Sequence, residues 1–106
     1  MKKIIFTLIT SIGLFFASCE SEQVKMGRDA CYDMMGKLSG KVEGDSHYTG
    51  KDGRLYWELE YHHWSEAKGT QVEFVHFVTN GNYAKDITKK EFESQTGRTA
   101  KISRVE

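Results

Sequence analysis

The chain is 106 residues long and carries fifteen basic and fifteen acidic side chains, so its formal net charge is zero at neutral pH. Charges of both signs are interspersed, which excludes the extended basic surface that binds nucleic acids or anionic lipid headgroups, and we expect no nucleic-acid partner. The sequence contains no proline, and turns are therefore expected at glycine, asparagine and aspartate.

The first eighteen residues have the composition of an export signal. Two lysines follow Met1, an apolar run extends over 4–16, and two small residues lead into Cys19. A charged start, an apolar middle of roughly 7–15 residues and a small-residue exit are typical of secretory signals. The run is too short for a membrane span, which needs about 20 apolar residues.

The end of this segment resembles the type II signal peptide of bacterial lipoproteins, through the tetrapeptide Phe16-Ala17-Ser18-Cys19. In that family the final cysteine receives a diacylglycerol thioether before cleavage, and its freed α-amine usually takes a third acyl chain. Phe16 departs from the leucine that is usual there. The resemblance covers 1–19 and implies a signal peptide over 1–18 and an exported protein, anchored through Cys19 in a membrane of the bacterial cell envelope. It does not distinguish the inner from the outer membrane.

An ordinary secretory signal is the alternative, in which Cys19 would pair with Cys31, the other cysteine of the chain. An oxidising compartment allows such a disulfide. The A-x-A-like exit that such a signal favours is missing, because Ala17 and Ser18 are followed by cysteine. We therefore favour the lipoprotein interpretation, in which Cys31 stays unpaired, either buried as a small hydrophobe or available for intermolecular pairing.

We expect the lipidated cysteine and a short tether over 19–23, followed by one domain over 24–106. A helix is predicted over 24–38, because apolar residues recur there at the three-and-four spacing of one helical face. These residues are Val24, Ala30, Cys31, Met34, Met35 and Leu38. Gly27 and Gly36 weaken the pattern, and Gly36 lies near the expected end of the helix.

Alternating segments rich in aromatic and β-branched residues predict strands after the helix. They are residues 41–48, 54–64, 70–79 and 99–105, with a shorter extended segment over 83–87. Turns at 50–53, 65–69 and 80–82 connect an antiparallel meander. The spacing of Thr88 and Glu91 is that of a capping box, which opens a short helix ending near Gly97.

These elements predict an α+β fold: one N-terminal helix packed on a curled antiparallel sheet of four to five strands, with a short helix before the last strand. The order of elements is similar to that of cystatin-like folds. The similarity is one of element order alone and implies nothing about activity, because the sequence contains no cystatin inhibitory motif.

A five-residue turn centred on Ala67 would pair Trp57 with Phe77 and Leu59 with Val75. These four residues form the core face that the helix would cover. The same register pairs Glu58 with His76 on the opposite face.

Extending this register to the neighbouring strands places His47 and Asp86 beside Glu58 and His76. Imidazole and carboxylate groups are ligands for zinc, and neighbours on adjacent strands lie about 4.5–5.5 Å apart at Cβ. The row His47, Glu58, His76 and Asp86 is therefore a candidate site of a metal-binding protein or metal-dependent enzyme. Charge pairing on a solvated face is the alternative that we favour, and a slip of one residue on any strand would destroy the row.

The face opposite the core also carries Tyr56, Trp64 and Phe74, alongside His62. Tyrosine and tryptophan are favoured anchors in protein recognition, so we expect these residues to form a partner-binding surface. The alternative is that the C-terminal segment covers this face, or that the sheet curls and buries both sides.

The sequence contains no Gly-rich phosphate loop and no H-E-x-x-H, C-x-x-C or G-x-S-x-G motif, so we expect no enzyme activity and no cofactor. The leading interpretation is a small, membrane-anchored envelope lipoprotein that binds a protein or peptide partner. A metal protein using the histidine and acid row, and a purely structural envelope lipoprotein, are the two alternatives.

Overall fold

The computed structural model describes residues 21–106, which begin with helix α3, Glu22–Met35. The predicted signal peptide and Cys19 lie outside the described residues. Ser21 caps the helix, since its hydroxyl accepts the backbone N–H of Val24 at 3.2 Å. The helix therefore begins two residues earlier than expected, and positions 22–23 of the predicted tether belong to it. It also ends earlier, with Gly36 as its C-cap.

Four strands then form an antiparallel meander, and a fifth lies near the C-terminus. They are β1 (Lys41–Thr49), β2 (Leu55–Ser65), β3 (Gly69–Asn80), β4 (Tyr83–Asp86) and β5 (Arg104–Val105). Within residues 21–106 the sheet order is β1-β2-β3-β4, and β5 pairs antiparallel with β3. The last strand, expected over 99–105, is thus reduced to two residues.

The second helix, α4 (Lys89–Thr96), begins where the capping box predicts. The hydroxyl of Thr88 accepts the backbone N–H of Glu91 at 3.0 Å, and Gly97 ends the helix in the left-handed region at φ 72°. The chain continues from Gly97 to Glu106, a segment we call the C-terminal strap. The predicted α+β fold, with one long helix, an open curled sheet and a short helix before the last strand, is confirmed.

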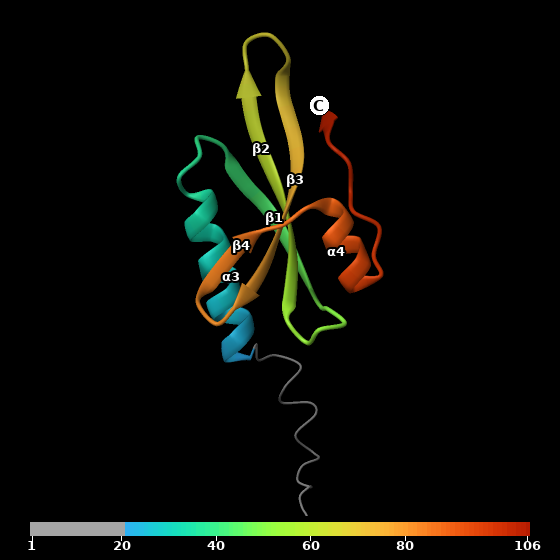
Figure 1. The fold of residues 1–106 in the computed structure, drawn as a ribbon. Coiled ribbons are helices and arrows are strands. Elements are labelled where there is room, and N and C mark those ends of the chain that lie inside the picture. The colour runs from blue at the N-terminus through green and yellow to red at the C-terminus, as the bar shows by residue number, and fades with distance from the viewer. Residues whose placement is uncertain (1–20) are drawn as a thin grey trace, which may run out of the picture.

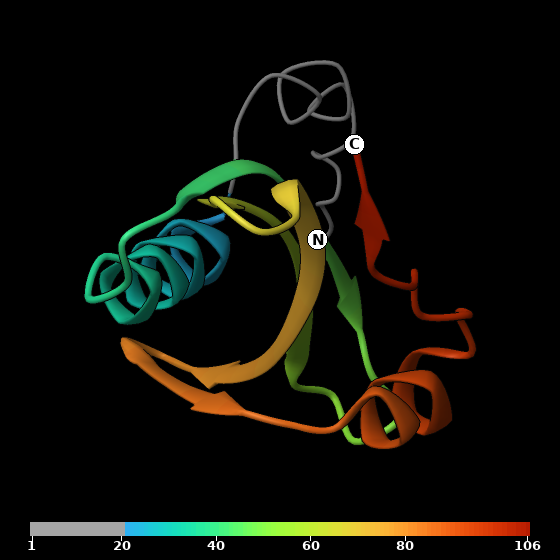
Figure 2. The same ribbon diagram turned by 90° about the horizontal axis from the view of Figure 1, so that it is seen from above.

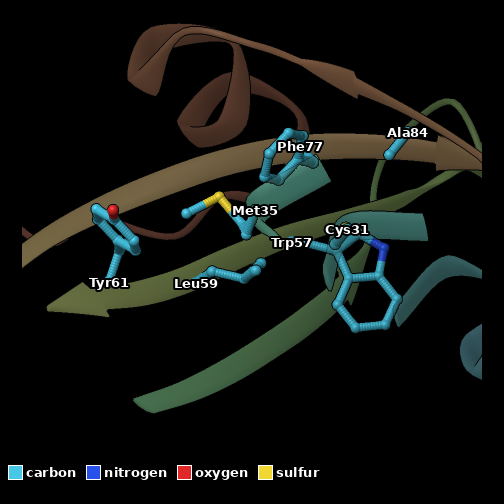
Figure 3. Packing of buried hydrophobic residues seen from close by; sticks show 7 residues of the cluster. All are labelled: Cys31, Met35, Trp57, Leu59, Tyr61, Phe77 and Ala84. Atoms are coloured by element: carbon cyan, nitrogen blue, oxygen red, sulfur yellow. The ribbon is translucent and has the colours of Figure 1, made fainter. Parts of the chain in front are cut away.

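The curled sheet is covered on both sides. Figure 2 shows α3 on its concave side, and α4 with the strap on its convex side. The concave face holds the larger cluster of buried side chains: Cys31, Met35, Trp57, Leu59, Tyr61, Phe77 and Ala84 (Figure 3). Trp57 pairs with Phe77 and Leu59 with Val75, so the predicted core register is confirmed.

Helix α3 approaches the sheet closely at Gly27. A Cβ atom there would lie 2.8 Å from Thr79 Oγ1 and 2.9 Å from Trp57 Cζ2, a spacing that real side chains do not tolerate. The same two neighbours are joined to each other, because the Trp57 indole N–H donates to Thr79 Oγ1 at 2.9 Å. The glycine that weakens the helix in the sequence therefore allows the helix to pack on the tryptophan.

A carboxylate on β1 ties the helix to the sheet edge. Asp45 accepts hydrogen bonds from Arg28 Nε at 3.3 Å and from the hydroxyl of Tyr32 at 2.7 Å. Burial and this hydrogen bond raise the pKa of Tyr32 to about 12. Burial, and secondarily the charge of Asp45, raises the pKa of the Cys31 thiol to about 12. Among the described residues Cys31 is a free, fully buried thiol, as one of the two predicted outcomes requires.

Candidate binding surface

The predicted row of histidines and acids does not form. His47 pairs with Trp57 rather than Glu58, because Gly50 N–H donates to Arg54 O and closes a three-residue loop over 51–53. Its ring packs against the Trp57 indole in a tilted arrangement, with centroids 5.0 Å apart, on the concave face. Each strand residue points opposite to its neighbours, so this one-residue shift moves His47 to the other side of the sheet.

Asp86 is also misplaced in the prediction. Asn80 pairs with Tyr83, which makes the turn two residues long, and Asp86 consequently pairs with Phe77 rather than standing beside His76. Within residues 21–106, no group of three or more histidine, cysteine, aspartate or glutamate side chains is arranged to hold a metal ion. The metal-site prediction is therefore wrong, since two of its four ligands lie on the opposite face.

Glu58 and His76 do meet, as the register predicts, but they are buried rather than solvated. Their Oε2 and Nε2 atoms lie 3.0 Å apart, and the two side chains are only 6% and 2% exposed. The same Glu58 oxygen accepts the backbone N–H of Lys101 at 2.9 Å, and Phe92 packs on the His76 ring at 4.5 Å between centroids. Glu58 therefore holds the strap against the sheet, and His76 holds Glu58 in place.

Two of the four residues predicted to form a partner-binding surface are buried. Tyr56 is fully covered, in a second cluster with Val78, Phe92 and Ala100. Its hydroxyl donates to Asp52 Oδ2 at 2.7 Å, and burial with this hydrogen bond raises the tyrosine pKa to about 12. Phe74 is 8% exposed, beneath the strap. The alternative stated above is therefore correct for this part of the convex face: α4 and the strap cover it.

Trp64 and His62 lie beyond this cover. Strand β1 begins opposite His62, so β2 and β3 continue past it as a hairpin that only the two-residue β5 joins, on the β3 side. The side chain of Trp64 is 68% exposed on this hairpin. His62 is partly exposed, and its Nε2 lies 2.6 Å from Glu60 Oε2, a contact that lowers the pKa of Glu60.

The hairpin end is held in a defined shape by its own side chains. The Ser65 hydroxyl accepts the backbone N–H of Lys68 at 3.2 Å and the amide of Gln71 at 3.1 Å, which fixes the turn. On the concave side, His63 Nε2 lies 2.6 Å from Glu73 Oε2, and the His63 ring stacks on Tyr61 at 5.4 Å. An exposed tryptophan on a braced hairpin loses little conformational freedom when it binds.

An open notch of about 290 Å³ lies beside Trp64, where β1 starts and β2 runs on. It is lined by Ser39, Gly40, Lys41, His62, His63, Trp64 and Thr70. The Gly40 N–H donates to the Tyr61 hydroxyl at 2.7 Å, and no Cβ would fit between them, so the chain passes close to the sheet here. We refer to this notch together with Trp64 as the hairpin-end surface.

The sequence reasoning missed the residues that cover Phe74. Lys101 Nζ and the Arg104 guanidinium carbon lie 5.6 and 6.0 Å from the centre of the Phe74 ring, and Arg98 lies 4.4 Å from that of Tyr48. These cations stand three residues apart along the strap. Their regular spacing, opposite a face already predicted to be aromatic, is the signal that could have indicated the cover.

Comparison with known proteins places this chain in no family. No family model, curated protein or solved structure matches it. Neither of the two helices described over 21–106 is long and apolar enough to cross a membrane.

Proposed function

We propose that the protein is a non-enzymatic binding module, anchored in a bacterial envelope membrane through Cys19, that holds a protein or peptide partner at its hairpin-end surface. The observation that carries the proposal is the 68% exposure of Trp64 on a hairpin that extends past the start of β1. Tryptophan is enriched among residues that dominate binding energy in protein interfaces.

The position of the hairpin supports this assignment. In Figure 1 the β2–β3 hairpin and the start of α3 lie at opposite ends of the domain. Helix α3 begins at Glu22, three residues after the proposed lipidated Cys19, so the domain would lie close to its anchor. The hairpin at the opposite end would then present Trp64 to partners away from the bilayer. The neighbouring polar groups of the notch supply the rim that such anchors usually have.

Site-specific photo-crosslinking in the full-length, membrane-anchored chain tests the partner site. A photoreactive residue replacing Trp64 is expected to yield a specific adduct. The same residue replacing Tyr83 serves as the matched control, because Tyr83 is 65% exposed on the β3–β4 hairpin at the other end of the domain. Equal labelling from both positions, or none from position 64, would contradict the proposal.

The anchor is tested separately by Cys19→Ser. We expect this variant to lose partitioning into a detergent phase and to accumulate as an uncleaved precursor, since two or three acyl chains hold a protein firmly at about 0.8 kcal/mol per buried CH₂ group. Mass spectrometry of the wild-type N-terminus should find Cys19 acylated. A bare sulfur in a correctly matured, soluble wild-type protein would exclude lipidation.

A further inference from the structure

The edge of β3 that faces away from β2 is only partly paired. β4 pairs with Phe77–Asn80, and β5 pairs with Gln71 and Val72. No strand described over 21–106 pairs with residues 73–75 on this edge. A strand edge with free backbone groups can accept an additional strand from another chain.

The strap that covers this region is held mainly by polar contacts. Backbone N–H groups of Lys101 and Ala100 donate to Glu58 and Glu93 carboxylates at 2.9 and 2.7 Å, and that of Glu106 donates to Thr70 O at 2.9 Å. Ala100 is the one strap side chain that is buried, whereas Ile102 and Val105 are 75% and 62% exposed. Apolar burial dominates stability, so a segment with one small buried side chain opens at a lower free-energy cost than the rest of the domain.

The charge of the strap complements the face beneath it. Arg104 reaches Glu60 at 3.7 Å and stands over the Phe74 ring, which Lys101 also approaches. Glu58 and Glu60 lie on the same face of β2 beside Phe74, while the strap carries basic residues at every third position from 98 to 104. The partly exposed Glu60 beside the Phe74 ring favours a cationic, extended segment through both ion pairing and cation–π contacts.

We propose that the β3 edge over residues 71–75, together with Glu60 and Phe74, is a docking surface for a basic, extended segment of a partner protein. The incoming segment pairs antiparallel with β3 and displaces the strap, which occupies the surface in the free protein as an internal substitute. A groove of about 170 Å³ beside β5 gives access to this edge. The surface adjoins the hairpin-end surface, whose residues include His62 and Thr70, but it does not depend on the function proposed for that surface.

The probe is a nine-residue peptide of alternating lysine and valine, with the matching glutamate and valine peptide as the control for charge. Binding to the full-length chain is measured by fluorescence anisotropy. In the Arg104→Glu variant the strap loses its contacts with Glu60 and Phe74, so the open fraction rises. We expect the basic peptide to bind this variant at least about tenfold more tightly than wild type, because apparent affinity scales with the binding-competent fraction. The acidic peptide should bind neither chain.

A disulfide across the strap provides the opposite perturbation. Gln71 pairs with Val105, and since the adjacent pair Thr70–Glu106 is hydrogen-bonded, this pair is of the close, non-hydrogen-bonded kind that suits a disulfide. Oxidised Gln71→Cys/Val105→Cys protein should not bind the basic peptide, and reduction should restore binding. Trp64→Ala should bind like wild type.

Several results would overturn the inference. They are undiminished binding to the oxidised double-cysteine protein, no gain in affinity with Arg104→Glu, or no binding of the basic peptide to any of these chains. Loss of binding in Trp64→Ala would instead assign the peptide to the hairpin-end surface, and would likewise exclude docking at the β3 edge.

Discussion

The two faces of the sheet are built from the same strands yet are covered in different ways. On the concave face one helix with an apolar stripe packs on Trp57, Leu59 and Phe77, and the cluster is almost entirely apolar. On the convex face a short helix and an irregular strap cover a smaller cluster, and a buried Glu58–His76 pair lies among its members. The first face resembles an ordinary hydrophobic core, whereas the second depends on a few polar contacts.

The concave face should therefore supply folding stability, whereas the convex face should allow a segment of the chain to be exchanged. Apolar burial is non-directional and scales with area, so the concave face should supply most of the folding free energy. A buried polar pair adds little net stability compared with apolar residues of similar size, and here it also accepts the Lys101 N–H of the strap above it. The convex face is therefore where a segment of the chain can be exchanged without loss of the fold.

The largest effect is expected from Trp57→Ala, which removes the largest fully buried side chain of the concave face. We expect a loss of about 3–5 kcal/mol in the free energy of unfolding, measured by chemical denaturation followed by circular dichroism. Trp64→Ala is the matched control, and its exposed side chain should change stability by no more than about 0.5 kcal/mol. Similar losses in both variants would mean that the concave cluster does not dominate.

On the convex face, Glu58→Leu should cost about 3 kcal/mol, because it leaves His76 without its buried partner and Lys101 N–H without its acceptor. The double variant Glu58→Leu/His76→Leu is expected to recover part of this loss, since an apolar pair replaces the buried, hydrogen-bonded polar pair. Equilibrium urea titrations compare the three chains. A double variant less stable than the single one would show that His76 stabilises the fold independently of Glu58.

A smaller loss, about 2 kcal/mol, is expected for Gly27→Ala, because the added methyl group meets Trp57 and Thr79 and pushes α3 away from the sheet. Gly44→Ala is the control, since a Cβ there would meet no atom within 4 Å. Thermal unfolding of both variants measures the difference. A Gly27→Ala protein as stable as Gly44→Ala would exclude tight helix packing as the reason for the glycine.

The smallest effect is expected from Cys31→Ala, which should change the pH dependence of stability only at alkaline pH. Burial raises the pKa of the Cys31 thiol to about 12 in the folded state, whereas the ordinary pKa of an exposed thiol is about 9.0. The unfolded chain therefore releases this proton first, and stability that is fully present below pH 9 falls as the pH rises toward 12. Cys31→Ala should flatten this fall relative to its own stability at pH 8. An unchanged slope of unfolding free energy against pH would assign the alkaline loss to the tyrosines instead.

Local patterns were sufficient to predict most of the secondary structure. The capping box at Thr88 and the turn centred on Ala67 depend on residues close together in the sequence, and the structure agrees with both. The apolar stripe of α3 is confirmed at Cys31 and Met35, whereas Met34 and Leu38 are exposed. The helix boundaries differ by two or three residues, because Ser21 and Gly36 act as caps. The four-residue core pairing followed correctly from one turn length.

The candidate sites were predicted less well, because they combine several strands. His47 and Asp86 each depend on a second turn, and an error of one residue in either turn reverses the face of the side chain. Tyr56 and Phe74 were placed on the correct face, but their burial depends on segments that approach from residues 88–106. Trp64 is exposed as predicted, because the strap reaches the hairpin only along the β3 edge at Thr70 and leaves the Trp64 side chain uncovered.

The amino-acid sequence by itself determined the order of elements, the core face of the sheet and the proposed address at Cys19, because periodicity, caps and short motifs act over a few residues. Only the tertiary structure decided which face each histidine occupies, and that the strap lies over Phe74. Both outcomes depend on contacts between residues far apart in the chain, where a single residue of register or one loop path changes the result and leaves no trace in local composition.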